Sequence, residues 1–399
     1  MQEKAKEPEI RFAGFTGAWE QRKAKDVLAA YSDKGHPGLD VLSATQDRGM
    51  VRRDDNNINI SHDKKNEATY KRVLPGQFVI HLRSFQGGFA YSSIEGITSP
   101  AYTVFGFSKP QEHEPNFWKF VFSSEQFIKR LEKVTYGIRD GRSISYDEVL
   151  TLSFTFPGKE EQIQIAHFLD KVGALITLHQ RKYEKLLNIK KSMLEKMFPK
   201  EGEVVPEIRF KGFTGAWEQR KLNEIADVYD GVHQTPKYTS SGVRFLSVEN
   251  IATLESEKYI SEADFIRDFK IFPQKGDILM TRIGDIGTAK VIKSDEKYAF
   301  YVSLALLKPK HINSDFLCNS IASKNFQKGL KARSLLTAIP LKINKEEIGK
   351  VATSFPLNLS EQEKIGSFFN HIESLLTLHQ RKLEMLKNVK QAFLEKMFV

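Results

Sequence analysis

The strongest constraint on the fold is a long internal repeat. PEIRFAGFTGAWEQRK at residues 8–23 returns as PEIRFKGFTGAWEQRK at residues 206–221, and only Ala13 against Lys211 differs. Two later segments also return: ITLHQRK at 176–182 becomes LTLHQRK at 376–382, and LEKMF at 194–198 recurs unchanged at 394–398. These periods of 198 and 200 residues are far longer than the roughly 20 to 50 residues of a solenoid repeat. Each copy is therefore expected to form a unit of domain size.

The stretches between the repeated segments have diverged. Residues 24–150 and 222–350 are similar in length but share only scattered features. We expect the near-identical parts to build a common frame and the divergent parts to face two different things. Function is therefore expected where the two copies differ.

A long amphipathic helix is predicted at the end of each copy. Residues 159–198 contain no proline, and their apolar residues recur in alternating steps of four and three, with His179 and Lys190 filling the remaining positions. This spacing is a heptad seam of the kind that packs helices into a coiled coil. Ser360 followed by Glu363 predicts a capping box at the start of the second helix. The apolar seam positions are Ile165, Leu169, Val172, Ile176, Tyr183, Leu186, Met193 and Met197 in the first copy and Ile365, Phe369, Ile372, Leu376, Leu383, Leu386, Phe393 and Met397 in the second.

The connectivity of the chain favours an antiparallel pair of helices with one globular domain at each end. In that arrangement the midpoints of the helices meet, so His179 and His379 are expected to approach each other near a dyad. We interpret them as hydrogen-bonded seam residues, with a metal site or a pH switch as the alternative. Trp19 and Trp217, which precede the divergent stretches, are expected to dock each linker onto the end of the opposite helix.

Each divergent stretch predicts an α+β domain. In the first, strands within residues 75–94 and 101–107 are followed by a helix over residues 114–134. The second has strands within residues 242–251, 275–292 and 301–309, and then a helix over residues 313–333. The predicted fold is therefore α+β, with two globular domains separated by two long antiparallel helices and related by a pseudo-twofold repeat.

Glycine-rich turns that carry arginine are the main candidates for a binding surface. Arg83 lies in LRSFQGG and Arg282 in TRIGDIG, where glycines let a partner approach the backbone closely. Arginine pairs bidentately with guanine in the major groove of DNA and with phosphate elsewhere, and any one of these residues is expected more often to face solvent or phosphate than a base. The other candidates lie in neighbouring segments: Ser84, Arg139, Arg142, Ser143, His233, Gln234, Thr235, Lys331, Arg333 and Ser334.

Composition excludes several classes of protein. The chain has 399 residues and a net charge of +10, which permits a polyanionic partner such as DNA without requiring one. Its apolar runs are much shorter than the ~20 residues that span a bilayer, so no membrane association and no secretory signal are expected. Cys318 is the one cysteine, which excludes a disulfide framework and fits a reducing, cytoplasmic compartment.

The sequence carries no recognisable catalytic motif. Phosphate-loop, dinucleotide-binding and zinc-protease motifs are all missing from it. Carboxylates are abundant, but those in KEEQ at residues 159–162 and in INKEEIGK at residues 343–350 fall in helical runs and are expected on solvated faces. Neither a catalytic centre nor a metal site is therefore expected in this chain.

Three sets of segments together resemble a known family. The PEIRFKGFTGAWEQRKL block, the FPGKEEQ and FPLNLSEQEKI starts of the long helices, and their LHQRK and LEKMF segments are similar to conserved regions of the DNA-specificity subunits of type I restriction-modification systems. The resemblance covers the whole chain in the family's order. It implies conserved segments at 1–23 and 200–221, target-recognition domains at 24–157 and 222–356, and spacer helices at 158–199 and 357–399.

The resemblance implies sequence-specific DNA binding without catalysis. Each recognition domain would read one half of an asymmetric bipartite site on double-stranded DNA, while the helices would set the spacer and dock two methyltransferase subunits. No cofactor is expected in this chain: S-adenosylmethionine, ATP and Mg would bind to the partners, which include helicase-nuclease restriction subunits in the full complex. A coiled-coil scaffold and a stand-alone bipartite DNA-binding regulator are the alternatives.

Overall fold

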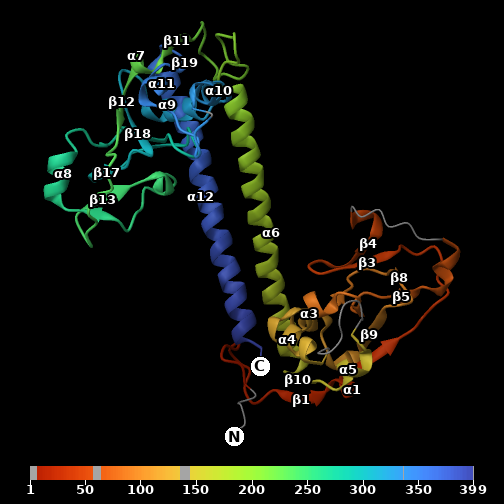
Figure 1. Ribbon diagram of the computed structural model, residues 1–399. Coiled ribbons are helices and arrows are strands. Elements are labelled where there is room, and N and C mark those ends of the chain that lie inside the picture. The colour runs from red at the N-terminus through yellow and green to blue at the C-terminus, as the bar shows by residue number, and fades with distance from the viewer. Residues whose placement is uncertain (1–6, 57–63, 135–143, 336, 399) are drawn as a thin grey trace. The chain divides into compact units, whose positions relative to one another are not determined.

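The computed structural model describes residues 7–56, 64–134, 144–335 and 337–398 of the chain. It divides into two compact units, one formed by Met1–His179 with Lys382–Val399 and the other by Gln180–Arg381. We call them unit 1 and unit 2. Each contains one divergent stretch and a part of both long helices (Figure 1), and each mixes helices with sheets, which confirms the α+β prediction.

The two long helices are α6 (Lys159–Lys196) and α12 (Leu359–Lys396). In unit 1, the first part of α6 packs against the last part of α12, with the rings of Phe168 and Phe393 4.6 Å apart. In unit 2, the last part of α6 packs against the first part of α12, where Lys190 donates a hydrogen bond to Glu373 at 2.6 Å. The helices are therefore antiparallel within each unit, as predicted. Buried seam residues include Ile165, Leu169, Val172, Ile365, Phe369, Ile372, Leu376 and Leu383.

The start of α12 differs from the prediction. Its first residue is Leu359, and the side-chain oxygen of Asn358 accepts a hydrogen bond from the Ser360 amide at 2.9 Å. The predicted capping box at Ser360 and Glu363 is therefore wrong, because Asn358 already satisfies an amide of the first turn and the helix begins two residues earlier than we expected.

Unit 1 contains one main sheet and three strand pairs. The main sheet has the order β2 (Leu28–Tyr31), β9 (Thr103–Phe107), β6 (Phe78–Ile80), β7 (Ala90–Tyr91), with all neighbours antiparallel. The pairs are β1 (Glu20–Lys23) with β10 (Ser153–Phe156), β3 (Leu42–Thr45) with β4 (Gly49–Arg52), and β5 (Lys71–Val73) with β8 (Gly96–Thr98). Its short helices are α1 (Ala24–Val27), α2 (Ser84–Gly87), α3 (Pro115–Ser123), α4 (Glu125–Val134) and α5 (Tyr146–Leu150), with 3-10 turns η1 (Arg53–Asn56), η2 (Lys64–Thr69) and η3 (Pro110–Glu112).

Unit 2 repeats the main sheet and adds a second one. The main sheet has the order β12 (Ala226–Asp230), β18 (Leu304–Pro309), β15 (Ile278–Thr281), β16 (Ala289–Val291), again with all neighbours antiparallel. A three-stranded sheet joins β14 (Tyr259–Ile260), β13 (Val243–Leu246) and β17 (Tyr298–Phe300), and β11 (Glu218–Lys221) pairs with β19 (Ala352–Phe355). Its short helices are α7 (Leu222–Ile225), α8 (Glu262–Asp268), α9 (Ser314–Ile321), α10 (Lys324–Arg333) and α11 (Lys345–Gly349), with the 3-10 turn η4 (Val248–Asn250).

The single helix predicted in each divergent stretch is in fact two helices. Ser124 separates α3 from α4, and Ser323 separates α9 from α10. Both serines adopt extended backbone angles, and the Ser124 hydroxyl accepts a hydrogen bond from the Phe127 amide at 3.2 Å. A serine in this position caps the next helix and ends the previous one, a local effect that hydrophobic periodicity does not reveal.

The repeated N-terminal segments dock onto the ends of the long helices, as predicted. In unit 1, Trp19 is 2% exposed, and its ring meets the edge of Phe117, which in turn contacts Phe398 just after α12. In unit 2, the Trp217 ring lies 6.0 Å from that of Phe198, just after α6. The buried rings thus pack the end of each long helix onto the domain core.

A second feature of this frame was not predicted. Arg11 forms an ion pair with Glu161 at 2.7 Å, and Arg209 forms the equivalent pair with Glu361 at 2.6 Å. The carboxylate side chains of Glu161 and Glu361 are only 2% and 1% exposed. The expectation that the KEEQ carboxylates are solvated is therefore wrong for Glu161, although it holds for Glu160, which is exposed. The missed signal is the Arg of PEIRF, which recurs with a Glu at the start of each long helix.

Candidate nucleic-acid interface

The antiparallel strand order gathers several loops of unit 2 at one edge of its main sheet. Strands β12 and β15 end at this edge, whereas β18 and β16 begin there. The connecting residues 231–242, 282–288 and 301–303 therefore lie together. The backbone confirms it, because the Arg282 amide donates to the Ser303 carbonyl at 3.0 Å.

One further loop joins this edge through hydrogen bonds. The Gly284 amide donates to the Leu341 carbonyl at 2.8 Å, and the Leu335 amide donates to the Lys342 carbonyl at 2.8 Å. We call residues 231–242, 282–288, 301–303, 335 and 337–343 the loop edge of unit 2. Most of its side chains are exposed or half-buried, so a partner can reach them.

Unit 1 has the equivalent edge. Strands β2 and β6 end at one side of its main sheet, where β9 and β7 begin. The connecting residues 32–41, 81–89 and 99–102 form what we call the loop edge of unit 1. The turns LRSFQGG and TRIGDIG thus occupy the same topological position in the two units, between β6 and β7 and between β15 and β16.

The polar triplet predicted in unit 2 lies on the loop edge. His233, Gln234 and Thr235 are all exposed and lie in the loop that follows β12. Lys237 and Lys342 on the same edge form no ion pair within the part of the chain that the structure describes, so their charges are available to a polyanion. The two lysines were not among the candidates, although their positions in the same loops would have indicated them.

The last turn of α10 brings two further candidates next to this edge. Lys331 and Arg333 are exposed, and Arg333 pairs with Glu347 at 3.2 Å. An exposed pair of this kind holds a side chain only weakly, so the guanidinium remains available to phosphate. Ser334 differs: it is 8% exposed and its hydroxyl donates to the Leu330 carbonyl at 2.8 Å, which makes it part of the helix end.

Arg282 is buried rather than presented. Its side chain is 7% exposed, its Nε donates to the Ile343 carbonyl at 3.0 Å, and its Nη1 pairs with the Asp230 carboxylate. Burial lowers the pKa of this guanidinium, and the negative charge of Glu346 opposes that shift only in part. The structure thus places Arg282 beneath the loop edge and not on its surface.

The candidates of unit 1 divide in the same way. Arg83 is exposed and forms no ion pair among the described residues. Ser84 is fully buried, and its hydroxyl accepts a hydrogen bond from the His81 amide at 2.8 Å, so it shapes the turn. Another segment of this loop edge, residues 32–41, carries Lys34, an exposed cation that was not a candidate. Arg139, Arg142 and Ser143 lie outside the described residues.

Two histidines were expected to meet at the middle of the long helices. His179 lies on α6 in unit 1 and His379 on α12 in unit 2, and both are half-buried. Their mutual approach stays a prediction.

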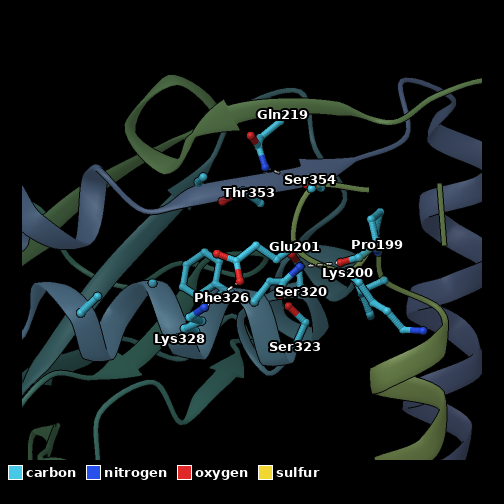
Figure 2. Close-up of a pocket in the computed structure, with 16 residues that line it drawn as sticks. Pro199, Lys200, Glu201, Gln219, Ser320, Ser323, Phe326, Lys328, Thr353 and Ser354 are labelled. Carbon is cyan, nitrogen blue, oxygen red and sulfur yellow. Dashed lines mark hydrogen bonds and ion pairs between the residues drawn. The ribbon is translucent and has the colours of Figure 1, made fainter. Parts of the chain in front are cut away.

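Unit 2 also contains a pocket of about 400 Å³ away from the candidate residues. Figure 2 shows it between the segment after α6, which includes Pro199 and Glu201, and the elements α10 and β19. The Thr353 hydroxyl lines it and is buried without a hydrogen-bond partner. Unit 1 has Phe154 at the position of Thr353 on the equivalent strand, and this buried ring packs against Trp118 and Phe122.

Reactive groups are few. The described residues include no group of three or more His, Cys, Asp or Glu side chains that could hold a metal ion. Burial raises the pKa of the Cys318 thiol to about 12, so this cysteine stays protonated and is a poor nucleophile. None of the helices in the described part of the chain is long and apolar enough to cross a membrane. What the structure does present is a polar loop edge in each unit, and that of unit 2 also has the exposed cations Lys237 and Lys342.

The main sheets of the two units thus share one strand order, while their loop edges differ in sequence. Residues 215–388 match the family model described as the type I restriction modification DNA specificity domain. Over these residues the chain is thus similar to the DNA specificity domains of type I restriction-modification systems.

Whole proteins are similar to the chain as well. The chain is 25% identical over 285 residues to the type I restriction enzyme MjaVIII specificity subunit of Methanocaldococcus jannaschii, an alignment that covers 67% of this chain and 65% of that relative's length. The fold is similar to the crystal structure of the type I restriction-modification S subunit from M. genitalium, with a TM-score of 0.58 and 13% identity over 98% of this chain and 99% of that one. A structure from a study of type I R-M complex assembly and conformational transition matches at a TM-score of 0.51 with 15% identity, over 95% of this chain and 97% of that one.

Proposed function

We propose that this chain is the non-catalytic DNA-specificity subunit of a type I restriction-modification complex. The observation that carries the proposal is the pair of loop edges, which share a strand order but differ in sequence, on a frame that is nearly identical in both copies. A protein that reads two unlike half-sites needs both a constant frame and divergent reading edges. The net charge of +10 then favours double-stranded DNA as the ligand.

Each loop edge reads one half of a bipartite site. Exposed cations such as Lys34 and Arg83 in unit 1, or Lys237 and Lys342 in unit 2, contact phosphates and give the binding its salt dependence. Polar side chains such as Gln234 in unit 2 have the donors and acceptors that distinguish base edges in the major groove. Specificity then differs between the halves because the two edges share few side chains.

The long helices set the distance between the half-sites. Each has 38 residues, which corresponds to about 57 Å of α-helix. One turn of B-DNA is about 34 Å, so helices of this length can hold two reading edges at a defined number of base pairs. Adding one heptad to both helices should lengthen the spacer and leave the bases of the half-sites unchanged.

Two methyltransferase subunits bind the repeated frame. Support comes from exposed residues that the fold does not require but that are identical in both copies, such as Thr16 with Thr214 and Gln21 with Gln219. Identical exposed surfaces suit two copies of one partner. In this proposal the methyltransferases bind S-adenosylmethionine, restriction subunits bind ATP and Mg, and the complex works in the cytoplasm.

A domain duplication within this chain tests the proposal. Residues 24–152 are replaced by residues 222–351, and the chain is co-expressed with its methyltransferase so that methylated adenines can be mapped. Because β1 and β11 both read EQRK, the incoming domain keeps the same strand beside it. The expected motif contains two copies of the half-site that unit 2 reads.

The reciprocal exchange is the matched control. Replacing residues 222–351 by residues 24–152 should give two copies of the other half-site. A motif that both exchanges leave unchanged would refute the assignment of recognition to these domains. Methylation that never depends on this chain would favour the scaffold alternative, and specific DNA binding without any methyltransferase in the cell would favour the regulator.

A further inference from the structure

The loop edge of unit 2 ends in an apolar tip. Ile339 is 99% exposed, more than any other large hydrophobic residue in the described part of the chain, and Pro340 beside it is also exposed. The loop is nevertheless well tied down, because the Ala338 amide donates to the Leu335 carbonyl at 3.1 Å and Lys342 bridges to both Leu335 and Ile283. The exposure of Ile339 is therefore built into a bonded loop.

Arg282 anchors this loop from below. Its Nε donates to the Ile343 carbonyl at 3.0 Å, and its own carbonyl accepts from the Ile343 amide at 3.0 Å. Its Nη1 pairs with Asp230, the last residue of β12. One buried side chain thus ties the end of β12 and the end of the Ile339 loop to β15.

Unit 1 lacks this anchor. Leu82 follows Phe78 by four residues, as Arg282 follows Ile278, and the two strands have the same place in their sheets. Leu82 is 53% exposed and cannot form an ion pair. The buried arginine is therefore specific to the reading edge of unit 2 and is not required by the shared fold.

The chemistry of the tip indicates what it contacts. A loop that only approached phosphates would gain nothing from an isoleucine, whereas apolar surface is stabilised when another apolar surface covers it. In DNA the bases offer such surfaces. One is the thymine methyl group in the major groove, and another is the face of a base when a side chain inserts between two stacked bases. Lys237 and Lys342 on the same edge supply the attraction to the flanking phosphates.

We propose that Ile339 makes apolar contact with bases in the half-site read by unit 2, and that Arg282 is a positioning residue that holds the Ile339 loop without touching DNA. The inference rests on the proposed function and adds the determinants of one half-site to it. The sequence-based expectation was that Arg282 contacts DNA directly, and the inference replaces that expectation.

The test uses the complex of the full chain with its methyltransferase. Affinity for an oligonucleotide containing the mapped site is measured over a range of salt concentrations for the variants Ile339→Ala and Arg282→Met. Each variant should bind the intact site about tenfold more weakly than the wild type does. The loss should disappear when the half-site read by unit 2 is scrambled in the oligonucleotide. The slope of log affinity against log salt should stay that of the wild type, because no phosphate contact is removed.

Matched controls lie in the same unit. Ile266→Ala removes an isoleucine that is 64% exposed on α8, and Arg244→Met removes an arginine that is largely buried and lies off the loop edge. Both should bind as the wild type does. Arg282→Lys serves as the alternative if Arg282→Met does not fold. It keeps the positive charge but loses the planar guanidinium that bonds both Asp230 and Ile343. It should also weaken binding only through the half-site read by unit 2.

A double-mutant cycle separates positioning from contact. If Arg282 acts through the loop, the double variant should bind no more than about twofold more weakly than the weaker single variant. Additive losses, or a salt slope that falls by about 0.9 in Arg282→Met, would show that Arg282 has its own DNA contact. Wild-type affinity in Ile339→Ala would refute the contact at the tip, and failure of the wild-type complex to bind DNA at all would refute the proposed function itself.

Discussion

The divergent domains of the two units reach the same strand order with different cores. Unit 1 buries a cluster of rings in which Phe78 contacts Phe105, Phe107 and Phe122. The corresponding core of unit 2 is mostly aliphatic, with residues such as Ile278 and Leu307 fully buried. The strand order and the helices packed on the sheet therefore carry the fold, whereas the identity of each core residue does not. Such a fold can change its loops without losing its architecture.

The frame around these cores shows the opposite behaviour. The ion pair of Arg11 with Glu161 recurs as that of Arg209 with Glu361, atom for atom. Charged groups buried in this way depend on their partner's geometry, so neither member can change alone. The difference teaches that the two copies of this fold keep the buried ion pairs of the frame, while the residues of the apolar core differ between them.

The largest expected effect comes from breaking one frame ion pair. Arg209→Met leaves the Glu361 carboxylate buried and unpaired, which should lower the free energy of unfolding by about 3–5 kcal/mol. Arg11→Met should do the same in unit 1. Urea unfolding measures both losses, with Arg267→Met as a control because that side chain is 66% exposed.

A double variant sharpens this result. Arg209→Met combined with Glu361→Leu removes both charges and should recover most of the lost stability. If Arg209→Met alone unfolds no earlier than Arg267→Met, the buried pair contributes nothing and the contrast between frame and core is wrong.

The next largest effect is a loss of stability in acid that unit 1 should show because of His113. Burial lowers the pKa of His113 to about 4, while the side chain in the unfolded chain keeps a pKa near 6.5. Above pH 6.5 both states are neutral at this site. Between about pH 6.5 and 4 the unfolded chain binds the proton and the folded chain does not, so the free energy of unfolding should fall by about 3 kcal/mol.

The equivalent position in unit 2 supplies the control. Glu114 and Asn313 cap α3 and α9 and donate their amides to Gln162 and Gln362, so His113 corresponds to Ile312. His113→Leu should remove this part of the acid destabilisation, as seen in unfolding curves at pH 7 and pH 4.5. An identical pH dependence in the variant would contradict the assignment.

The smallest effect concerns the pocket of unit 2. Thr353→Val keeps the shape of the side chain and removes the buried hydroxyl that lacks a partner, so unit 2 should gain about 1 kcal/mol. Thermal unfolding measures the shift, and Ser354→Ala is the control on the same strand. A loss of stability would mean that the hydroxyl has a bound partner in solution.

Much of the fold follows from the sequence, but the site follows only in part. Heptad spacing predicts both long helices because it repeats over 38 residues, and connectivity predicts their antiparallel packing. The boundary between α3 and α4 was missed because one serine caps a helix without disturbing the apolar pattern. Of the candidates in glycine-rich turns, Arg83 is exposed and Arg282 buried, although both turns have the same place in the fold.

The sequence by itself determined the duplication, the two long helices and the α+β class, because each of these is written in identities or periodicities that can be read along the chain. Only the tertiary structure decided which candidate side chains are exposed to a partner and which are buried. Arg282 is buried by contacts with Asp230 and Ile343, which lie 52 and 61 positions away. Burial of this kind depends on residues that meet only after folding, so no local pattern around Arg282 reveals it.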